Sequence, residues 1–335
     1  MTDRPIPPAA TSSDVARLAG VSRTTVSYVL NGTGSARISA ATRARVREAA
    51  LRLGYVPHAA ARSLRAGRNR MVLMPSPSIL VGPLLGEFFL QLHQGLAGLG
   101  YSIAGLGGPA PADDTDAARA WAELRPAAVF SLDGTGFSPE GVELLRRSGV
   151  GALVTFAPSP VPGVHTVLHD PTEVGTLAAD HLLSRGCRRL GVVVPREPGL
   201  ELFSRPRLQG VYATAAAAGA HAERLDLDYT EESARALAAR WHELRLDGVF
   251  AYNDEYAMLL MRALQDAGVD VPARTALIGA DDLLLGRLLR PRLSTVRLVL
   301  PDPHELAALI DLSVRGEAPS RVPEMGLMVV RREST

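Results

Sequence analysis

The stretch SSDVARLAGVSRTTVSYVLNGTG, residues 12–34, contains two short helical patterns separated by a single glycine. Val15, Leu18 and Ala19 recur at the i, i+3, i+4 spacing that places apolar side chains on one face of a helix. Gly20 follows at once and can end that helix in a left-handed conformation. The stretch therefore predicts a short helix, a tight turn and a second helix.

Serines stand where these two helices would begin, and a serine hydroxyl is a good acceptor for the free N–H groups of a first turn. Ser12 or Ser13 would cap the first helix, and Asp14 would suit the positive end of its dipole. Ser22 would cap the second helix, which we expect to run from Arg23 to Leu30. The whole pattern is typical of a helix-turn-helix.

A third helix would complete a small core. Ser39 is its candidate N-cap, and the helical pattern continues to about Leu53. The apolar positions expected to face inward are Ala44, Val46, Ala50 and Leu51, and the arginines expected to face outward are Arg43, Arg45 and Arg47. We therefore expect a helix-turn-helix head at residues 12–57, preceded by a disordered, proline-rich arm at residues 1–11.

The second helix has the chemistry of a DNA-recognition helix. Its outward side chains can form hydrogen bonds with base edges, and its first turn offers free N–H groups to a phosphate. The candidate DNA contacts on this helix and its cap are Ser22, Arg23, Thr24, Thr25, Ser27 and Tyr28. The alternative is a helical hairpin that only packs against another part of the protein.

The net charge of +1 hides an asymmetry along the chain. Twelve arginines against three acids give residues 1–70 a charge of +9, and 24 arginines against 32 acids give the remainder −8. Binding to a phosphate backbone requires such a local basic excess, although a solvated basic face would have the same composition. The charge therefore favours DNA binding by the head.

Residues 14–32, DVARLAGVSRTTVSYVLNG, resemble the DNA-binding head of the lactose/galactose repressor family of bacterial transcription regulators, and the resemblance continues through residues 38–68. It implies that residues 58–70 form a hinge helix and linker. This helix would fold on DNA, pair with its counterpart in a second copy and insert a leucine into the minor groove. The further DNA contacts that it implies are Asn31, Arg37, Ala61, Leu64 and Arg65. Arginine often stands at the position of Tyr28 in the family, so we expect different operator half-sites here.

From Met71 onward, apolar strands alternate with amphipathic helices. This alternation predicts parallel sheets that helices cover on both faces. The expected strands are residues 70–76, 101–107, 127–134, 151–157, 188–195, 247–254 and 275–282. The expected helices include residues 87–99, 113–124, 171–185, 205–218, 231–244 and 255–267.

The run from residue 71 to residue 335 is about twice what one doubly wound sheet needs, so we divide it into two subdomains. The resemblance implies a body similar to periplasmic sugar-binding proteins, with three chain crossings between the subdomains. The expected subdomains are N, at about 71–168 and 298–325, and C, at about 169–297 and 326–335. The predicted fold is a small all-α helix-turn-helix head followed by an α/β, periplasmic-binding-protein-like body of two doubly wound parallel-sheet subdomains. This body would carry both effector binding and dimerisation.

A ligand in such a body would bind beyond the carboxyl ends of the strands, between the subdomains. The resemblance implies that Arg207, Asn253 and Asp281 occupy positions that hold effectors in family members. The full set of candidate effector contacts is Leu85, Asp170, Arg207, Asn253 and Asp281. The alternative for the Asp and Asn residues is capping of the helix that follows each strand.

Two departures from the family fall on this candidate pocket. An aromatic pair often follows a proline in the first subdomain, whereas Leu84 and Leu85 follow Pro83 here. Leu298 stands where a glutamine usually reaches the pocket. The loss of a ring and an amide favours an effector that is smaller or more apolar than a common hexose, or else an impaired pocket.

Two other function classes could use the same α/β body. The segment SIAGLGGPA, residues 102–110, resembles the start of a dinucleotide-binding motif of an NAD-dependent enzyme, but Pro109 and Pro111 stand where the phosphate-binding helix should begin. A secreted solute-binding protein would lack residues 12–68 and carry a signal peptide. We find no Ser/His/Asp arrangement and no metal-spaced His/Cys cluster, so we predict no catalytic residues, no cofactor and no metal.

The single cysteine, Cys187, excludes an intramolecular disulfide and agrees with a reducing compartment. No apolar run approaches the roughly 18 residues that span a bilayer, so we predict a cytoplasmic protein without membrane contact. Its predicted function is that of a homodimeric transcriptional regulator, a repressor rather than an activator. It would bind a pseudo-palindromic operator, with an affinity controlled by a sugar or other small metabolite between the subdomains.

Overall fold

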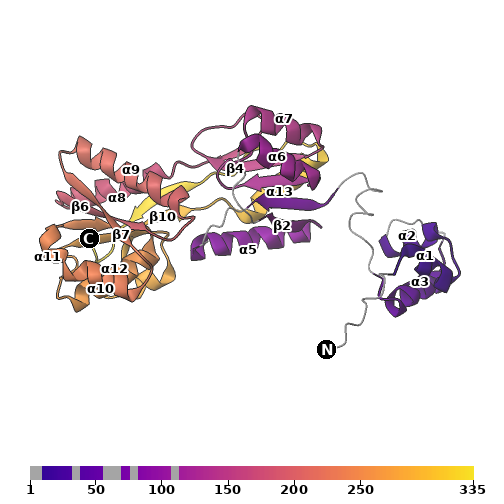
Figure 1. Ribbon diagram of the computed structural model, residues 1–335, viewed down its shortest axis with the longest axis horizontal. Coiled ribbons are helices and arrows are strands. Elements are labelled where there is room, and N and C mark those ends of the chain that lie inside the picture. The colour runs from indigo at the N-terminus through magenta and orange to yellow at the C-terminus, as the bar shows by residue number, and fades with distance from the viewer. Residues whose placement is uncertain (1–9, 32–37, 56–68, 76–81, 107–112) are drawn as a thin grey trace. The chain divides into compact units, whose positions relative to one another are not determined.

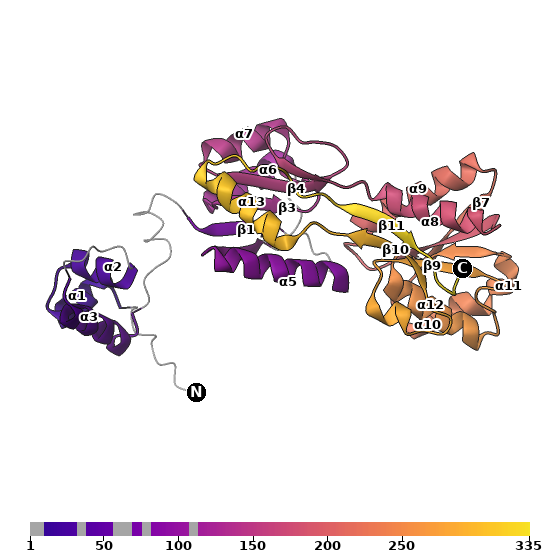
Figure 2. The same ribbon diagram turned by 180° about the vertical axis from the view of Figure 1, so that it is seen from behind.

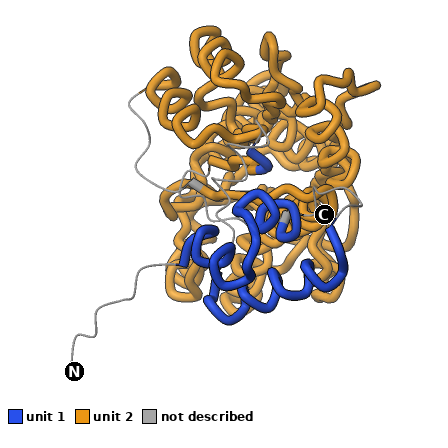
Figure 3. Tube along the Cα trace, turned by 90° about the vertical axis from the view of Figure 1, so that its right-hand side faces the viewer, with its two compact units in different colours: residues 1–70 blue, residues 71–335 orange. Residues whose placement is uncertain are grey.

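The computed structural model describes residues 10–31, 38–55, 69–75, 82–106 and 113–335. The chain separates into two compact units, residues 1–70 and residues 71–335, which we call the head and the body (Figure 3). Four of the predicted DNA contacts lie outside the described residues, namely Arg37, Ala61, Leu64 and Arg65.

The head contains the helices α1 (Ser12–Ala19), α2 (Arg23–Asn31) and α3 (Ala40–Arg52) (Figure 1). Gly20 ends α1 in the left-handed conformation, with φ of 63°, and its N–H bonds to the carbonyls of Ala16 and Arg17. The buried core is formed by Val15, Ala16, Ala19, Val26, Val29, Val46, Ala49 and Ala50. The predicted helix-turn-helix is confirmed.

The cap of α1 differs from the prediction. Thr11, not Ser12 or Ser13, is the N-cap: its hydroxyl accepts the N–H of Asp14, and the Asp14 carboxylate accepts the N–H of Thr11 at 3.0 Å. This reciprocal capping box needs an acid three residues after the cap, and only Thr11 has one at that spacing. Thr11 therefore belongs to the head rather than to the predicted arm.

Three of the predicted core positions of the head are also wrong. Leu18 is 47% exposed, Leu51 is 82% exposed, and Ala44 is exposed as well. In α3 the buried face passes through Val46, Ala49 and Ala50, and the next residue lies a further 100° around the helix. Leu51 therefore points to solvent despite its apolar side chain.

The body contains two sheets. The first has the strand order β2-β1-β3-β4-β5 and is entirely parallel, with β1 at Met71–Pro75, β2 at Ser102–Leu106, β3 at Ala128–Ser131, β4 at Ala152–Ala157 and β5 at His165–Leu168. The second has the order β11-β10-β9-β8-β6-β7, with β6 at Arg189–Pro195, β7 at His221–Leu227, β8 at Gly248–Phe250, β9 at Ala276–Ala280, β10 at Ser294–Val299 and β11 at Gly326–Val330. Only the pairing of β11 with β10 is antiparallel among these described strands.

Helices cover both faces of each sheet, as the sequence pattern predicts (Figures 1 and 2). Around the first sheet these are α5 (Pro83–Gly98) and α13 (Pro303–Arg315) on one face and α6 (Asp114–Glu123) and α7 (Pro139–Arg147) on the other. Around the second they are α8 (Thr172–Ser184) and α9 (Glu201–Ala217) on one face and α10 (Glu231–Ala239), α11 (Trp241–Leu244) and α12 (Asp254–Asp266) on the other. The 3₁₀ helix η1 (Leu284–Arg287) follows β9.

The chain passes between the two sheets three times. It leaves the first sheet after Leu168, returns to it after Val299 through α13, and leaves again before Gly326. β10 thus extends two residues beyond the crossing expected at 297. Among the described residues, no helix combines the length and the apolar character needed to cross a membrane.

The sequence pattern did not predict β5, β7, β10 or β11. β5 and β7 are edge strands, which need only one apolar face, and Arg224 and Asp226 alternate in β7 with the buried Leu225 and Leu227. The first residues of β10 are polar, buried and hydrogen-bonded inside the fold. The start of this strand therefore lacks the run of apolar residues that would predict it.

Candidate DNA-binding and effector sites

The recognition helix α2 is fixed by its cap and by its inner face. Ser22 Oγ accepts the N–H of Thr25 at 3.1 Å, and Val26 and Val29 are buried in the head core. On the outer side Arg23 and Thr24 are exposed and Tyr28 is 46% exposed, whereas Ser27 is partly buried. Asn31 is the last residue of α2. Arg23, Thr24 and Tyr28 are therefore presented to solvent, as is Ser22, which forms the cap of α2 with Thr25.

The body contains a cleft of about 780 Å³ lined by both subdomains. All five predicted effector residues line it, namely Leu85, Asp170, Arg207, Asn253 and Asp281. They come from α5, from the crossing after β5, from α9 and from the ends of β8 and β9. The fold thus brings together residues that lie nearly 200 positions apart in the sequence.

Arg207 is the central cation of the cleft. Its side chain is buried, Nη1 donates to the carbonyl of Tyr252 at 2.6 Å, and Nη2 lies 3.8 Å from Oδ1 of Asp281. Its Cζ lies 5.0 Å from the centroid of the Tyr252 ring, a cation–π distance. Within the described part of the chain its Nε–H has no hydrogen-bond partner. Arg207 is therefore held in place with donor capacity to spare.

Asp281 reaches the cleft from an unusual backbone conformation. Asp281 and Asp282 follow β9 with φ of 98° and 56°, a region that L-residues rarely adopt. Burial raises the pKa of the Asp281 carboxyl, while the Arg207 guanidinium and the Asn253 amide act in the opposite direction. A ligand that donates hydrogen bonds here would stabilise the charged form.

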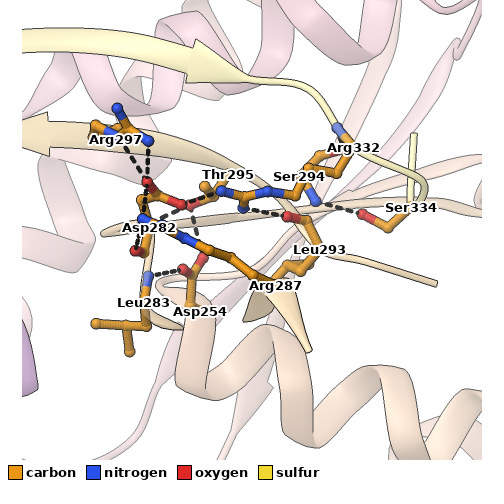
Figure 4. Close-up of polar contacts among 10 residues, drawn as sticks. All are labelled: Asp254, Asp282, Leu283, Arg287, Leu293, Ser294, Thr295, Arg297, Arg332 and Ser334. Atoms are coloured by element: carbon orange, nitrogen blue, oxygen red, sulfur yellow. Dashed lines mark hydrogen bonds and ion pairs between the residues drawn. The ribbon is translucent and has the colours of Figure 1, made fainter. Parts of the chain in front are cut away.

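A polar network holds this conformation (Figure 4). Asp282 accepts hydrogen bonds from Arg287 at 2.8 Å, from Arg297 at 2.6 Å and from Arg332. Burial opposes ionisation of Asp282, yet the bonds from Arg332 and Arg297 hold its pKa below the usual value. The network links the end of β9 to η1, to β10 and to the segment after β11, so it fixes the backbone from which Asp281 projects.

A second buried acid braces the same turn. The two carboxylate oxygens of Asp254 accept the N–H of Leu283 and the hydroxyl of Thr295, each at 2.7 Å (Figure 4). Burial raises the pKa of Asp254 to about 7. Asp254 is the first residue of α12 and does not line the cleft, so it supports the site from behind.

The capping alternative holds for Asn253, which is the N-cap of α12 and whose Oδ1 accepts the N–H of Tyr256 at 3.1 Å. It does not hold for Asp170, because Pro171 is the N-cap of α8. Asp170 instead accepts the N–H of Thr172 at 2.9 Å and its hydroxyl at 2.7 Å, in the turn before that helix. Both residues also line the cleft, so these bonds fix their position without removing them from it.

Sequence reasoning missed most of the aromatic and acidic lining. The missed residues are Asp133, Phe156, His169, Glu197, Phe203, Tyr229, Tyr252, Glu255 and Tyr256. Burial and the nearby Arg207 lower the pKa of His169 to about 4, so this imidazole is neutral near pH 7. Tyr229 follows β7, and the same strand-end rule would have found it had that edge strand been predicted.

Known proteins match the chain along its whole length. The family model "Bacterial regulatory proteins, lacI family" matches residues 11–58, and the model "Periplasmic binding protein-like domain" matches residues 179–335. The HTH-type transcriptional regulator GntR of Pseudomonas aeruginosa is 30% identical over 337 residues, which cover 97% of this chain and 95% of that protein.

Solved structures give the same result. A LacI family transcriptional regulator from Silicibacter pomeroyi has a TM-score of 0.75 at 25% identity, covering 97% of this chain and 99% of that one. The transcriptional regulator CelR in complex with cellobiose has a TM-score of 0.58 at 26% identity, covering 97% and 100%. These matches favour a regulator over a solute-binding protein or an NAD-dependent enzyme. The chain is a helix-turn-helix transcriptional regulator of the LacI family.

Proposed function

We propose that the protein is a homodimeric repressor that binds a pseudo-palindromic operator through α2 of each head. Its operator affinity would be controlled by a small molecule bound in the cleft of the body. The observation that carries this proposal is the presence in one chain of an exposed, capped recognition helix and a cleft with a buried arginine that has spare donors. The complex of the relative CelR with cellobiose supports a small organic effector.

Operator binding can be tested by selection of bound fragments from genomic DNA. We expect enrichment of a sequence with two-fold symmetry, because two copies would present two identical recognition helices. Arg23→Ala should weaken binding to it by about 1–3 kcal/mol, since this exposed side chain faces outward from α2. Arg147→Ala, on the surface of α7, is the matched control and should change nothing. Equal losses in both variants would show only a general charge effect.

Exposed leucines support self-association of the body. Leu284, Leu285 and Leu288, in and just after η1, are 68%, 60% and 66% exposed. A cluster of exposed apolar side chains on a folded domain marks an interaction surface. We expect a Leu285→Ser, Leu288→Ser double variant to sediment as a monomer, whereas Leu51→Ser, on the head, should remain dimeric. A double variant that stays dimeric would place the interface elsewhere.

We also propose that the body has no catalytic activity, in keeping with a family of regulators. Its lone thiol supports this. Cys187 is buried, and burial, assisted by the charge of Asp247, raises its pKa to about 11. A thiol of this kind is not a nucleophile near pH 7. Failure of iodoacetamide to modify Cys187 in the folded protein would agree with this reading.

A further inference from the structure

The C-subdomain wall of the cleft carries three tyrosine rings. The centroids of Tyr229 and Tyr256 are 5.1 Å apart, and those of Tyr252 and Tyr256 are 5.6 Å apart. Tyr252 and Tyr256 are buried, whereas Tyr229 is 50% exposed. The faces of such rings attract cations, and Arg207 already occupies this kind of position at Tyr252. The ring of Tyr229 remains accessible to a ligand.

Glu255 places a negative charge beside all three rings. Burial raises the pKa of each tyrosine, and the charge of Glu255 contributes to each rise. The Glu255 carboxylate is only half buried and accepts one long hydrogen bond, from Asn253 Nδ2 at 3.3 Å. No described cationic side chain lies within 4 Å of it. Glu255 is therefore a carboxylate in the cleft without a counter-ion among the residues that the structure describes.

Glu197 bonds to the backbone of Tyr229 and to the ring hydroxyl of Tyr256. Its carboxylate accepts the N–H of Tyr229 and the hydroxyl of Tyr256, each at 2.5 Å. The hydroxyl bond is directed to the carboxylate, so Tyr256 stays neutral and its ring is locked. A preorganised ring loses little freedom when a ligand binds. Glu197 also adds a second negative charge at the same end of the cleft.

The described lining of the cleft is strongly acidic. It contains the carboxylates of Asp133, Asp170, Glu197, Glu255 and Asp281 and a single guanidinium, that of Arg207, with His169 neutral. Arg207 already lies 3.8 Å from Asp281, so it balances at most one of these acids. A cleft lined by one sign of charge concentrates ligands of the opposite sign.

We propose that the effector is an organic cation, a protonated amine whose charged group lies between the Glu255 carboxylate and the ring of Tyr229. The proposal rests on the proposed function, in which this cleft is the effector site. Beside the Tyr252 ring, the buried Nε–H of Arg207 lacks a partner within the described structure, so the ligand carries an acceptor oxygen there. The apolar side chains of Leu84, Leu85 and Leu132 cover the body of the ligand.

A neutral polyol is the competing ligand, because its hydroxyls could also donate to these carboxylates. Both an amine and a hydroxyl would form a charge-assisted hydrogen bond with the Glu255 carboxylate, but only the protonated amine adds the attraction between two full charges. The ring of Tyr229 adds a contact that distinguishes a cation from a neutral group. The cleft therefore selects the amine over its neutral isostere.

Calorimetry on the full-length protein with two matched pairs tests this selection. The pairs are D-glucosamine against D-glucose and benzylamine against benzyl alcohol. We expect at least one amine to bind, with an affinity at least about tenfold above that of its neutral partner. Glu255→Gln should abolish this preference, whereas Glu143→Gln, on the exposed surface of α7, should retain it.

The proposal is overturned if the neutral member of a pair binds as tightly as the amine, or if Glu255→Gln keeps the preference. It is also overturned if neither amine binds at about 10 mM, a concentration at which even a weak site fills. Operator affinity, measured by fluorescence anisotropy in the same solutions, separates this outcome from the proposed function. An amine that binds without changing operator affinity would refute effector control alone. A neutral sugar that binds and changes operator affinity would refute the ligand class alone.

Discussion

The head and the body present their candidate binding residues in opposite ways. In the head, Arg23, Thr24 and Tyr28 project from one helix into solvent, and the valines on its other side form the core. In the body, the candidate residues come from five separate segments, and the polar ones are bonded to groups inside the fold, as Arg207 is to the backbone of Tyr252. One site is a surface on a folded unit, and the other is part of the packing itself.

Because of this difference, a side-chain replacement in the head site should change DNA binding with little effect on folding, whereas a replacement in the cleft should change both ligand binding and folding stability. An exposed side chain on α2 can be replaced with little effect on folding, because it makes few contacts within the head. Replacement of a buried group in the cleft leaves its partner unsatisfied, which costs free energy in the folded state as well as in the complex. The predictions below test this contrast, starting with the largest expected effect.

Removal of the head should abolish operator binding and leave the body intact. The body has its own cores around both sheets, and the head has a separate one. A protein consisting of residues 71–335 should lose operator affinity by a factor of about a thousand or more, the usual excess of specific over non-specific binding. Its thermal midpoint should stay within a few degrees of that of the full-length body transition. Calorimetric melting and anisotropy measure both, and tight DNA binding by the truncated protein would refute the division of function.

A single methyl group between α8 and α9 should destabilise the body strongly. A Cβ on Gly175 would lie 1.9 Å from the carbonyl oxygen of Arg207, so the two helices would have to separate. We expect Gly175→Ala to lower the free energy of unfolding by about 3 kcal/mol, at the upper end for overpacking, and to weaken ligand binding because Arg207 moves with its helix. Gly98→Ala, on the exposed surface of α5 with open space around it, is the control for denaturant unfolding. Equal stability of the two variants would mean that α8 and α9 can move apart at this contact at little cost in free energy.

The sequence predicted the head better than the cleft because the head depends on local spacing. Gly20 and Ser22 define its turn within a few residues, and both roles are confirmed. The errors there, such as the exposed Leu51, arise from a rotation of 100° around one helix. A short apolar pattern does not determine, to within one residue, which side of the helix faces the core.

The strand-end rule predicted only part of the cleft, and Arg207 on α9 was added by the family resemblance. Asn253 and Asp281 end central strands and could be found by that rule, whereas Tyr229 follows the unpredicted edge strand β7. Contacts between distant segments left no local signal at all. The close approach of Gly175 to Arg207 and the three arginines around Asp282 depend on tertiary packing, which a strand and helix pattern does not specify.

Replacement of Arg207 should weaken ligand binding by the body and leave operator binding by the head unchanged. Arg207→Ala removes a charged donor from the cleft and leaves Asp281 without its cation, which should cost about 1.5–3 kcal/mol of ligand binding, a tenfold to hundredfold loss. Operator affinity without ligand should be unchanged, since the head does not use this residue. Arg205→Ala, exposed on the same helix, is the matched control for calorimetry with whichever ligand binds. Unchanged affinity in Arg207→Ala would remove this residue from the site.

The smallest expected effect is a pH dependence that belongs to the body alone. Because the pKa of Asp254 is raised from 3.8 to about 7, the folded body keeps a proton that the unfolded chain has already lost between these values. The free energy of unfolding should therefore fall as pH rises, by about 1 kcal/mol between pH 5 and pH 6 from this group. Asp282, whose pKa is lowered, contributes only at lower pH and with the opposite sign. His169, whose pKa is lowered to about 4, contributes a rise over the same range in both proteins, so the two are compared with each other. Between pH 5 and pH 6 the wild type should lose about 1 kcal/mol relative to Asp254→Asn, which has no proton to lose at this position.

Denaturant unfolding at pH 5 and pH 6 measures this difference, with Asp266→Asn on the surface of α12 as the matched control. The control should keep the pH dependence of the wild type, because Asp266 is on the surface and its ion pair is with the exposed Arg262. The isolated head, which lacks Asp254, should show no such fall over the same range. If Asp254→Asn retains the full pH dependence, the buried proton resides on another carboxyl. Asp254 would then be ionised over the whole range, and the arginines around Asp282 would be left as the groups that stabilise the turn at Asp281.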